Sequence, residues 1–517
     1  MSSSNQNERT NEDAYIEADE AEEIFTRDED QPMDSDGEDA DGDHEMGYEQ
    51  EEITLENDSV AHFDSHTDSV FCIAQHPIHN AIVVTGSGDD TAYVFDSTPN
   101  AHRPLLPASY ESDPQPKQER VSLEPIVKME GHTDTVNAVA FTEPRGEYIV
   151  TAGLDGRLRA WHDTTPQQAG TAWAFIGEAQ EVEEINWVAV CPAGNGEEKN
   201  NVVAVGGSDG SAWVFRINHK ESSDPVSIVQ SFFQHTGPCT AGAWSPDGNL
   251  LATVSEDGSF YVFDVFGAAA ASGVSYSAGT SAVVGLTAED QRFAVEGGLY
   301  SVAIAPNGGI AAVGGAGGHI KIVGIPRLGS AAPAKTTKGR GAASQTSGAT
   351  AGLLLASLQH QSDSVETLSF SAAPLTLLAA GSVDGSIALF DTAHRFAVRR
   401  HIREAHEGAV VQVEFLQSRA NATPPIRSST LAAAASGQAR SFLLTSVGID
   451  GVVRRWDARG GTAAASFGLL NEWKGHLGLT EDDEGEQAGG IMGFVQGFDG
   501  KRVVTAGDEG VSLVFEE

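Results

Sequence analysis

The stretch TAGLDGRLRAWH, residues 151–162, contains the signature of the unit from which most of this chain is built. Asp155 stands six residues before Trp161, and five other copies place an aspartate at the same distance before an aromatic residue. Those copies pair Asp89 with Phe95, Asp209 with Phe215, Asp257 with Phe263, Asp384 with Phe390, and Asp450 with Trp456. Self-similarity at a fixed period is typical of repeat architectures, so the repeat decides the fold class.

A histidine stands upstream of most of these aspartates at an almost constant distance. The distance is 23 residues both from His66 to Asp89 and from His132 to Asp155. The other predicted pairs are His235 with Asp257, His360 with Asp384, and His406 with Asp450. One pair per unit, with Thr85, Thr151 or Thr253 four residues before the aspartate, predicts a buried hydrogen-bond relay that fixes a turn. A catalytic dyad is the alternative, but no nucleophile or oxyanion hole accompanies the pairs.

Each unit also contains four short apolar runs that are separated by turn residues. In the second unit these runs are TVNAVAF (135–141), EYIVTAG (147–153), RLRAWH (157–162) and TAWAFI (171–176). Four strands per unit and eight units predict an all-β, eight-bladed β-propeller over residues 53–517. The last unit stops after three strands, whereas residues 58–63 form a lone fourth strand. We expect residues 58–63 to close the ring by completing that blade, which removes an exposed edge.

Charge and composition limit the possible partners. The 517 residues include 31 Lys and Arg against 74 Asp and Glu, which gives a net charge of −43. Residues 1–52 are acidic and poor in apolar residues, so we predict a disordered acidic tail. Because the rest of the chain is acidic too, the balance argues against direct nucleic-acid or anionic-membrane binding. It favours a basic partner, which such a charge would attract at long range.

Several classes of site find no support in the sequence. The cysteines Cys72, Cys191 and Cys239 form no C-x-x-C motif, and the histidines are spread at blade spacing. We therefore expect no metal, cofactor or catalytic residue. The polar N-terminus lacks the features of a secretory signal, and no apolar run has the length of a membrane helix. We expect a monomer in a reducing compartment, namely the cytoplasm, with the nucleus as an alternative.

Surface carboxylates at the starts of the first strands are the candidates for partner binding. They are Asp68, Asp134, Glu183, Glu184, Asp363, Glu366 and Glu407, and the turns add Glu256, Asp508 and Glu509. Asp68 and Asp134 could equally cap their own loops. Glu184 and Glu366 are predicted to occupy a position that holds Phe71 or Tyr300 in other units, so the fold does not require an acid there. A ring of carboxylates beside a channel would suit arginine side chains, which carboxylates bind bidentately.

The units resemble WD repeats over residues 58–517, with a literal Trp-Asp at residues 456–457 and Phe-Asp at three other sites. The fifth unit departs most, since Gly317 and Val323 replace the aspartate and the aromatic residue. A narrower resemblance rests on SVFCIAQHP (69–77), SVETLSF (364–370) and SVGIDGVVRRWDARGG (446–461). These stretches are similar to the group of angio-associated migratory cell proteins and Sqt-type ribosome-assembly chaperones.

That resemblance implies a non-enzymatic chaperone. It would bind the basic N-terminal segment of a newly made large-subunit ribosomal protein (uL-sixteen, called L-ten in yeast) and deliver it to the pre-60S particle. A WD-repeat scaffold or adaptor, such as a ubiquitin-ligase substrate receptor or a histone-binding propeller, is the alternative. Proteins that co-purify with the chain would distinguish the two, because only the first predicts one small basic ribosomal protein.

Overall fold

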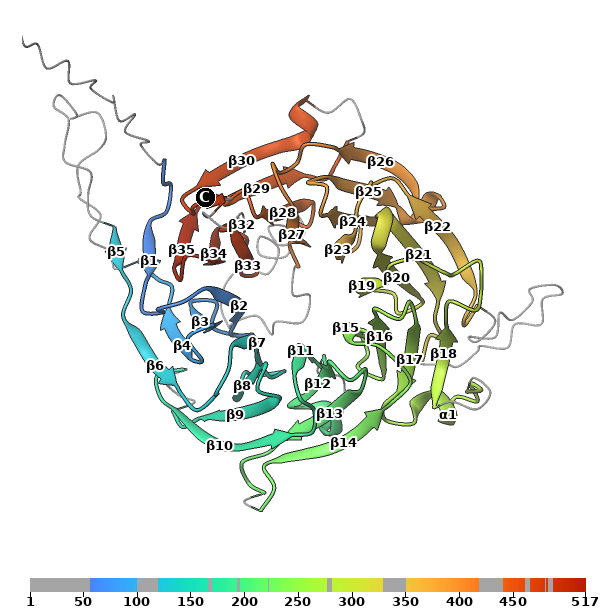
Figure 1. Ribbon diagram of the computed structural model, residues 1–517, viewed down its shortest axis with the longest axis horizontal. Coiled ribbons are helices and arrows are strands. Elements are labelled where there is room, and N and C mark those ends of the chain that lie inside the picture. The colour runs from blue at the N-terminus through green and yellow to red at the C-terminus, as the bar shows by residue number, and fades with distance from the viewer. Residues whose placement is uncertain are drawn as a thin grey trace, which may run out of the picture. The chain divides into compact units, whose positions relative to one another are not determined.

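The computed structural model describes residues 56–99, 120–165, 170–192, 196–221, 223–276, 281–328, 350–417, 440–460, 465–478, 480–481 and 487–517. The predicted disordered tail, residues 1–52, lies outside this range. The described strands form eight sheets of at least four strands, which are arranged as blades around a central channel (Figure 1). The fold class predicted for the repeats, an eight-bladed propeller, is confirmed.

Seven blades are antiparallel meanders that start at the channel and end at the rim, and blade eight takes its outer strands from an earlier part of the chain. The innermost strands are β2 (Val70–Gln75), β7 (Val136–Phe141), β11 (Ile185–Val190), β15 (Cys239–Trp244), β19 (Leu299–Ile304), β23 (Val365–Phe370), β27 (Val410–Phe415) and β33 (Ile491–Val495). The second strands are β3 (Ile82–Ser87), β8 (Tyr148–Gly153), β12 (Val202–Gly207), β16 (Leu250–Ser255), β20 (Ile310–Gly315), β24 (Leu377–Ser382), β28 (Leu443–Gly448) and β34 (Arg502–Gly507).

The outer half of each blade completes the meander. The third strands are β4 (Ala92–Asp96), β9 (Arg157–Asp163), β13 (Ala212–Ile217), β17 (Phe260–Asp264), β21 (His319–Gly324), β25 (Ile387–Asp391), β29 (Val452–Asp457) and β35 (Ser512–Glu516). The outermost strands are β6 (Pro125–Met129), β10 (Trp173–Gln180), β14 (Val226–Phe232), β18 (Ala282–Leu286), β22 (Leu354–Gln359), β26 (Ala397–Ile402), β30 (Leu469–Lys474) and, in blade eight, β1 (Ala61–Phe63).

The remaining elements are short. They are β5 (Val121–Ser122), the hairpin strands β31 (Thr480–Glu481) and β32 (Gln487–Ala488), the helix α1 (Ala268–Ala271) and the 3-10 turns η2 (Glu197–Lys199), η3 (Ala316–Gly318), η4 (Thr392–His394) and η5 (Ala465–Gly468).

The core lies between blades. The second strand β8 is buried at every position, because neighbouring blades cover both of its faces. Trp161 of blade two packs in one cluster with Val84 and Val94 of blade one. The aromatic residue six positions after each aspartate is thus an interblade contact, as the repeat predicted.

The ring closes through β1, the segment for which the sequence predicted this role. Ala61, His62 and Phe63 pair antiparallel with Val514, Leu513 and Ser512 of β35. The Phe63 ring stacks on Phe95 of blade one with a centroid distance of 4.3 Å. The sequence did not predict β5, which pairs in parallel with the outer edge of β1. The closing strand therefore has a neighbour on each side.

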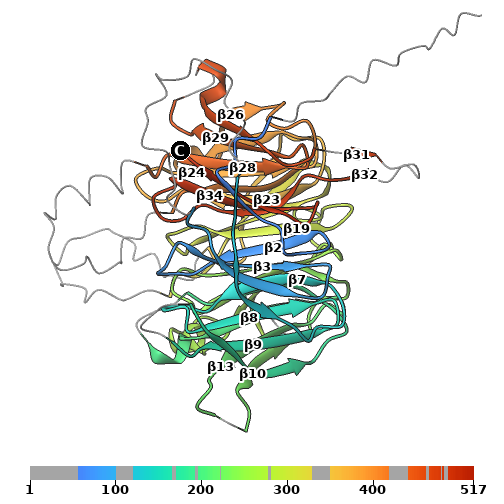
Figure 2. The same cartoon turned by 90° about the vertical axis from the view of Figure 1, so that its left-hand side faces the viewer.

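The two faces of the ring carry different connections. The fourth-to-first and second-to-third connections of every blade open on one face, which we call the mouth face. Figure 2 shows the β31–β32 hairpin, part of the fourth-to-first connection of blade eight, at one side of the ring. The first-to-second and third-to-fourth connections open on the opposite face.

Candidate partner-binding face

Three blades contain the hydrogen-bonded relay that the repeat predicted. His132 Nδ1 lies 3.1 Å from each carboxylate oxygen of Asp155, and its Nε2 lies 2.8 Å from Thr151 Oγ1. The same contacts join His66 with Asp89 and Thr85, and His406 with Asp450 and Ser446. These acids serve the fold, because their partners lie inside the same blade.

Two of the predicted pairs are corrected by the structure. His235 does not bond Asp257 directly, because Ser259 stands between them with its Oγ 2.6 Å from His235 Nδ1. His360 is exposed and takes no part in a relay. The buried place belongs to the next residue, Gln361, whose amide donates to Ala380 O at 3.2 Å and to Ser386 O at 3.0 Å. The spacing of 24 residues from His360 to Asp384, one more than in the first two units, was the signal of this shift.

Blade eight contains a relay that the sequence reading missed. His476 Nδ1 lies 2.5 Å from Glu509 Oε1, and its Nε2 lies 2.6 Å from Thr505 Oγ1. Glu509 thus takes the place of the relay aspartate, a role that the sequence did not predict for it. The longer glutamate side chain concealed the equivalence. Its neighbour Asp508 accepts a hydrogen bond from Gly489 N at 2.6 Å.

In blades two and four, the surroundings lower the pKa values of the relay aspartate and of the relay histidine. Burial alone would raise the pKa of Asp155, but hydrogen bonds from Arg157 N, His132 and Thr133 N outweigh it and lower the pKa. The pKa of Asp257 falls to about 2 in the same way. Burial lowers the pKa of His235 to about 4. A buried neutral imidazole is a hydrogen-bonding element here rather than a proton donor.

The acids of the fourth-to-first loops are exposed at the mouth face. Asp68, Asp134, Glu183 and Asp363 occupy equivalent loop positions, and all four are exposed. Three of them also cap their loops, since Asp68, Asp134 and Asp363 each accept a hydrogen bond from the following backbone N–H at 2.7 Å. One oxygen of each capped carboxylate, Oδ1, accepts this bond. Glu407 is exposed as well and lies one position earlier in its loop.

Asp90 is a carboxylate of this face that the sequence reading passed over. It stands in the left-handed region with φ 61°, where most other blades have a glycine. Burial and the charges of Asp134, Asp89 and Asp155 raise its pKa. Asp90 of blade one and Asp134 of blade two therefore share one patch of negative potential.

One residue of each innermost strand bulges out of register at the mouth of the channel. These bulge residues are Phe71, Asn137, Asn186, Thr240, Tyr300, Glu366, Val411 and Met492. Glu366 is at the predicted position, but Glu184 is not, because Asn186 forms the bulge of blade three. Glu184 precedes the strand as Ser69 and Ser364 do, and its carbonyl accepts from Ser208 N at 3.1 Å. Glu184 nevertheless remains exposed on the same face.

Glu366 differs from the relay acids in having no hydrogen-bond donor among the described residues. Burial and the charge of Asp363 raise its pKa. Burial raises the pKa of Tyr300, and the negative charges of Glu256 in blade four and of Glu366 raise it further. Both carboxylates therefore lie near Tyr300. Blades four to six therefore present Glu256, Asp363 and Glu366 around the mouth. A cation placed there would relieve the repulsion among them.

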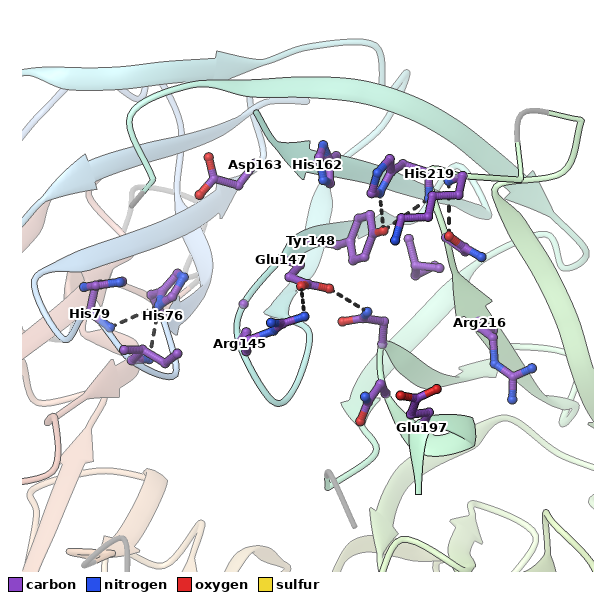
Figure 3. Close-up of a pocket in the computed structure, with 17 residues that line it drawn as sticks. His76, His79, Arg145, Glu147, Tyr148, His162, Asp163, Glu197, Arg216 and His219 are labelled. Carbon is purple, nitrogen blue, oxygen red and sulfur yellow. Dashed lines mark hydrogen bonds and ion pairs between the residues drawn. The ribbon is translucent and has the colours of Figure 1, made fainter. Parts of the chain in front are cut away.

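The opposite face holds a cleft of about 780 Å³ between blades one, two and three (Figure 3). Tyr148, His162 and His219 form its wall, with the two imidazole centroids 3.9 Å apart and Tyr148 Oη 2.6 Å from His219 Nδ1. Its cations Arg145, Arg216 and Lys220 are matched by Glu147, Asp163 and Glu197. This cleft lacks the surplus of carboxylates found at the mouth face.

Neither a membrane-spanning helix nor a metal site is found among the described residues. No described helix has both the length and the apolar character needed to cross a membrane. Within the same ranges, no group of His, Cys, Asp and Glu side chains has the geometry to hold a metal ion.

Comparison with known proteins identifies the family. The WD domain, G-beta repeat, matches residues 57–96, 123–162 and 226–264. The solved structure of Sqt1 from Chaetomium thermophilum is 50% identical, covers 89% of this chain and 98% of its own, and superposes with a TM-score of 0.71. The chain belongs to the Sqt1 family of WD-repeat proteins.

Other members of this family extend the comparison. A second structure of Chaetomium thermophilum Sqt1, bound to the N-terminus of ribosomal protein L10, is 49% identical and covers 89% of this chain and all of its own, with a TM-score of 0.71. Ribosome assembly protein SQT1 of Saccharomyces cerevisiae is 26% identical over 94% of this chain and 93% of its own. Angio-associated migratory cell protein of Homo sapiens is 24% identical over 89% of this chain and 80% of its own.

Proposed function

We propose that this protein is a dedicated chaperone that binds the basic N-terminal segment of ribosomal protein L10 at the mouth face and delivers the protein to the assembling large subunit. The observation that carries the proposal is the set of exposed carboxylates on that face, of which Glu183, Glu184 and Glu366 accept no side-chain hydrogen bond among the described residues. The Sqt1 of Chaetomium thermophilum, a relative of the same family, has been solved with the N-terminus of L10 bound.

The electrostatics of the mouth suit an arginine-rich segment. A guanidinium group donates two parallel hydrogen bonds to one carboxylate, so each of Glu366, Asp363 and Glu183 could hold one arginine. Burial and the charge of Asp363 raise the pKa of Glu366, and a cation bound beside it would favour the charged form and oppose that shift. The net charge of −43 would also speed the encounter with a basic client at low salt.

Shielding explains why such a client needs a partner. A basic segment in the cytoplasm, where ribosomal proteins are made, would otherwise bind RNA through its positive charges. We propose the cytoplasm as the place of capture. The chaperone role is preferred to the adaptor role because the Saccharomyces cerevisiae relative is a ribosome assembly protein and the Chaetomium thermophilum relative binds the N-terminus of L10. We propose no catalytic role for the relay acids, because they are hydrogen-bonded inside their own blades.

Titration of a labelled peptide with the L10 N-terminal sequence against the full chain tests the proposal. We expect Glu366→Lys to weaken binding about 30-fold or more, because reversing one partner of a desolvated charge pair costs ~2–5 kcal/mol. Glu197→Lys is the matched control, since Glu197 is an exposed acid at the opposite face. Equal affinities for the wild type and both variants would refute binding at the mouth face.

A further inference from the structure

The ring of bulge residues divides into two arcs, which differ in whether their side chains form hydrogen bonds to the next blade. Asn137 Nδ2 donates to Ile185 O at 2.6 Å, Asn186 Nδ2 to Cys239 O at 3.1 Å, and Thr240 Oγ1 to Leu299 O at 2.6 Å. Each of these bonds runs to the innermost strand of the next blade. These three residues, from blades two to four, form the tied arc. Their polar groups are used to hold adjacent blades together.

The other five bulge residues follow one another from blade five through blade eight to blade one. They are Tyr300, Glu366, Val411, Met492 and Phe71, and we call them the free arc. Tyr300 Oη bonds to Gly297 O of its own blade, and no described residue donates a hydrogen bond to the Glu366 carboxylate. Unlike the tied arc, the free arc forms no side-chain hydrogen bond to the next blade among the described residues.

Apolar surface is exposed at Phe71 and Leu477, whereas Val411 and Met492 of the free arc are half-buried. Phe71 is 40% exposed, and a Cβ at Gly88 would lie 3.2 Å from its Cε2 atom, so the ring rests beside the turn of blade one. Leu477, which is 42% exposed, lies in the loop that leads to Met492, and its carbonyl accepts from Gly490 N at 2.9 Å. Exposed apolar side chains gathered at a channel mouth are typical of a binding surface.

The two ends of the free arc carry different types of side chain, so the arc has a direction. It begins with an aromatic ring and a carboxylate, Tyr300 and Glu366, and ends with two aliphatic or thioether side chains and a second aromatic ring. A guanidinium can bond the carboxylate and stack on the ring of Tyr300. The bulge residues at the opposite end offer apolar contacts, with the carboxylate of Asp68 near Phe71, and the flexible side chain of Met492 adapts to the shape of its partner.

We propose that the free arc fixes the direction of the bound segment, with an arginine at Tyr300–Glu366 and an apolar or aromatic side chain of the same peptide on Val411, Met492 and Phe71. This inference rests on the proposed function, because it assigns the apolar contacts to the same basic client. The acids attract any basic peptide, whereas the apolar end selects those with a hydrophobic residue at the right distance.

Two probes separate attraction from selection. One is the labelled L10 N-terminal peptide, and the other is an oligo-arginine peptide of the same net charge. For the L10 peptide we expect Phe71→Ser and Met492→Ser each to weaken binding about tenfold, equally at low and high salt, because apolar contacts are not screened. For oligo-arginine both variants should bind like the wild type. Thr240→Val, in the tied arc, is the control and should leave the affinities for both probes unchanged.

The outcomes distinguish this inference from the proposed function. If Glu366→Lys loses the L10 peptide but Phe71→Ser and Met492→Ser keep it, the free arc does not select and the inference fails alone. If the wild type does not bind the L10 peptide, the proposed function fails and the inference falls with it. Val411→Thr, which nearly preserves shape, replaces either serine variant that does not fold, and unchanged binding of the L10 peptide by Val411→Thr would overturn the inference in the same way.

Discussion

Asp155 and Glu366 are both carboxylates at the mouth end of this propeller, yet their surroundings differ in every respect that decides a role. Asp155 accepts hydrogen bonds from His132 and from backbone N–H groups, which lower its pKa. Glu366 has no such donor among the described residues, and burial together with Asp363 raises its pKa. An acid with internal partners stabilises the blade, whereas an acid without them is available to a ligand.

The largest effect that we expect outside the binding site comes from opening the ring. Deleting residues 1–65 removes β1 and exposes the edge of β35, whereas deleting residues 1–52 leaves β1 in place. The melting temperature should fall clearly in the first truncation and stay near that of the full chain in the second. Equal melting temperatures for the two truncations would show that β1 contributes nothing to closure.

The relay is the next largest. Asp155→Ala leaves His132 and two backbone N–H groups without their acceptor, so we expect a loss of ~1–3 kcal/mol in the free energy of unfolding. Binding of the L10 peptide by the folded fraction should be unchanged. Denaturant titration and peptide titration on the same preparation check both halves. A stable variant that had lost the peptide would move Asp155 into the binding site.

Blade six allows the same contrast between neighbouring residues. Gln361→Ala removes two buried hydrogen bonds, so we expect a cost of ~1–2 kcal/mol in the free energy of unfolding. His360→Ala should cost less than ~0.5 kcal/mol, because His360 is exposed. A larger cost for His360→Ala than for Gln361→Ala would restore the original pairing of His360 with Asp384.

Acid should destabilise the fold in two successive stages. Burial lowers the pKa values of the relay histidines His66, His132, His235 and His406, to about 4 for His235, so the folded state resists their protonation. Stability should therefore fall as the pH drops from about 6.5 towards 4. The relay aspartates, with pKa values of about 2 for Asp257 and Asp384, add a second loss between about pH 4 and pH 2. Denaturant titrations across this range measure both stages, and constant stability from pH 7 to 4.5 would contradict the first.

Peptide affinity should respond to acid before the aspartates titrate. Glu366 must be ionised to bind a guanidinium, and its pKa lies above the ordinary 4.5. Affinity for the L10 peptide should therefore decrease as the pH falls through that raised pKa. Glu366→Gln should show a smaller decrease over the same range, and an identical pH profile for this variant would exclude Glu366 as the titrating group.

The repeat made the fold predictable, because every unit carries the same apolar runs and the same aspartate six residues before an aromatic residue. The acidic face also followed from the repeat, since its loops can be placed from strand order alone. The residue that forms the bulge in each innermost strand could not be predicted from strand order. A bulge shifts the register by one residue, so Glu184 was assigned the place that Asn186 occupies.

Departures from the repeat were the other source of error. Gln361 and Glu509 take over roles that the pattern reserves for histidine and aspartate, and a pattern search finds neither. Asp90 was hidden because it replaces a glycine at a left-handed turn position. The parallel strand β5 joins residues far apart in the chain, and two residues carry too little pattern to predict it.

The most direct test of the account measures affinity and stability together on Glu366→Gln and Asp155→Asn, two substitutions that each remove one negative charge with little change in shape. Peptide titration and thermal melting are performed on both variants and on the wild type. We expect Glu366→Gln to weaken binding of the L10 peptide at an unchanged melting temperature, and Asp155→Asn to lower the melting temperature at an unchanged affinity. The reverse pattern, or a loss of affinity in Asp155→Asn without a loss of stability, would contradict the division between acids of the fold and acids of the binding face.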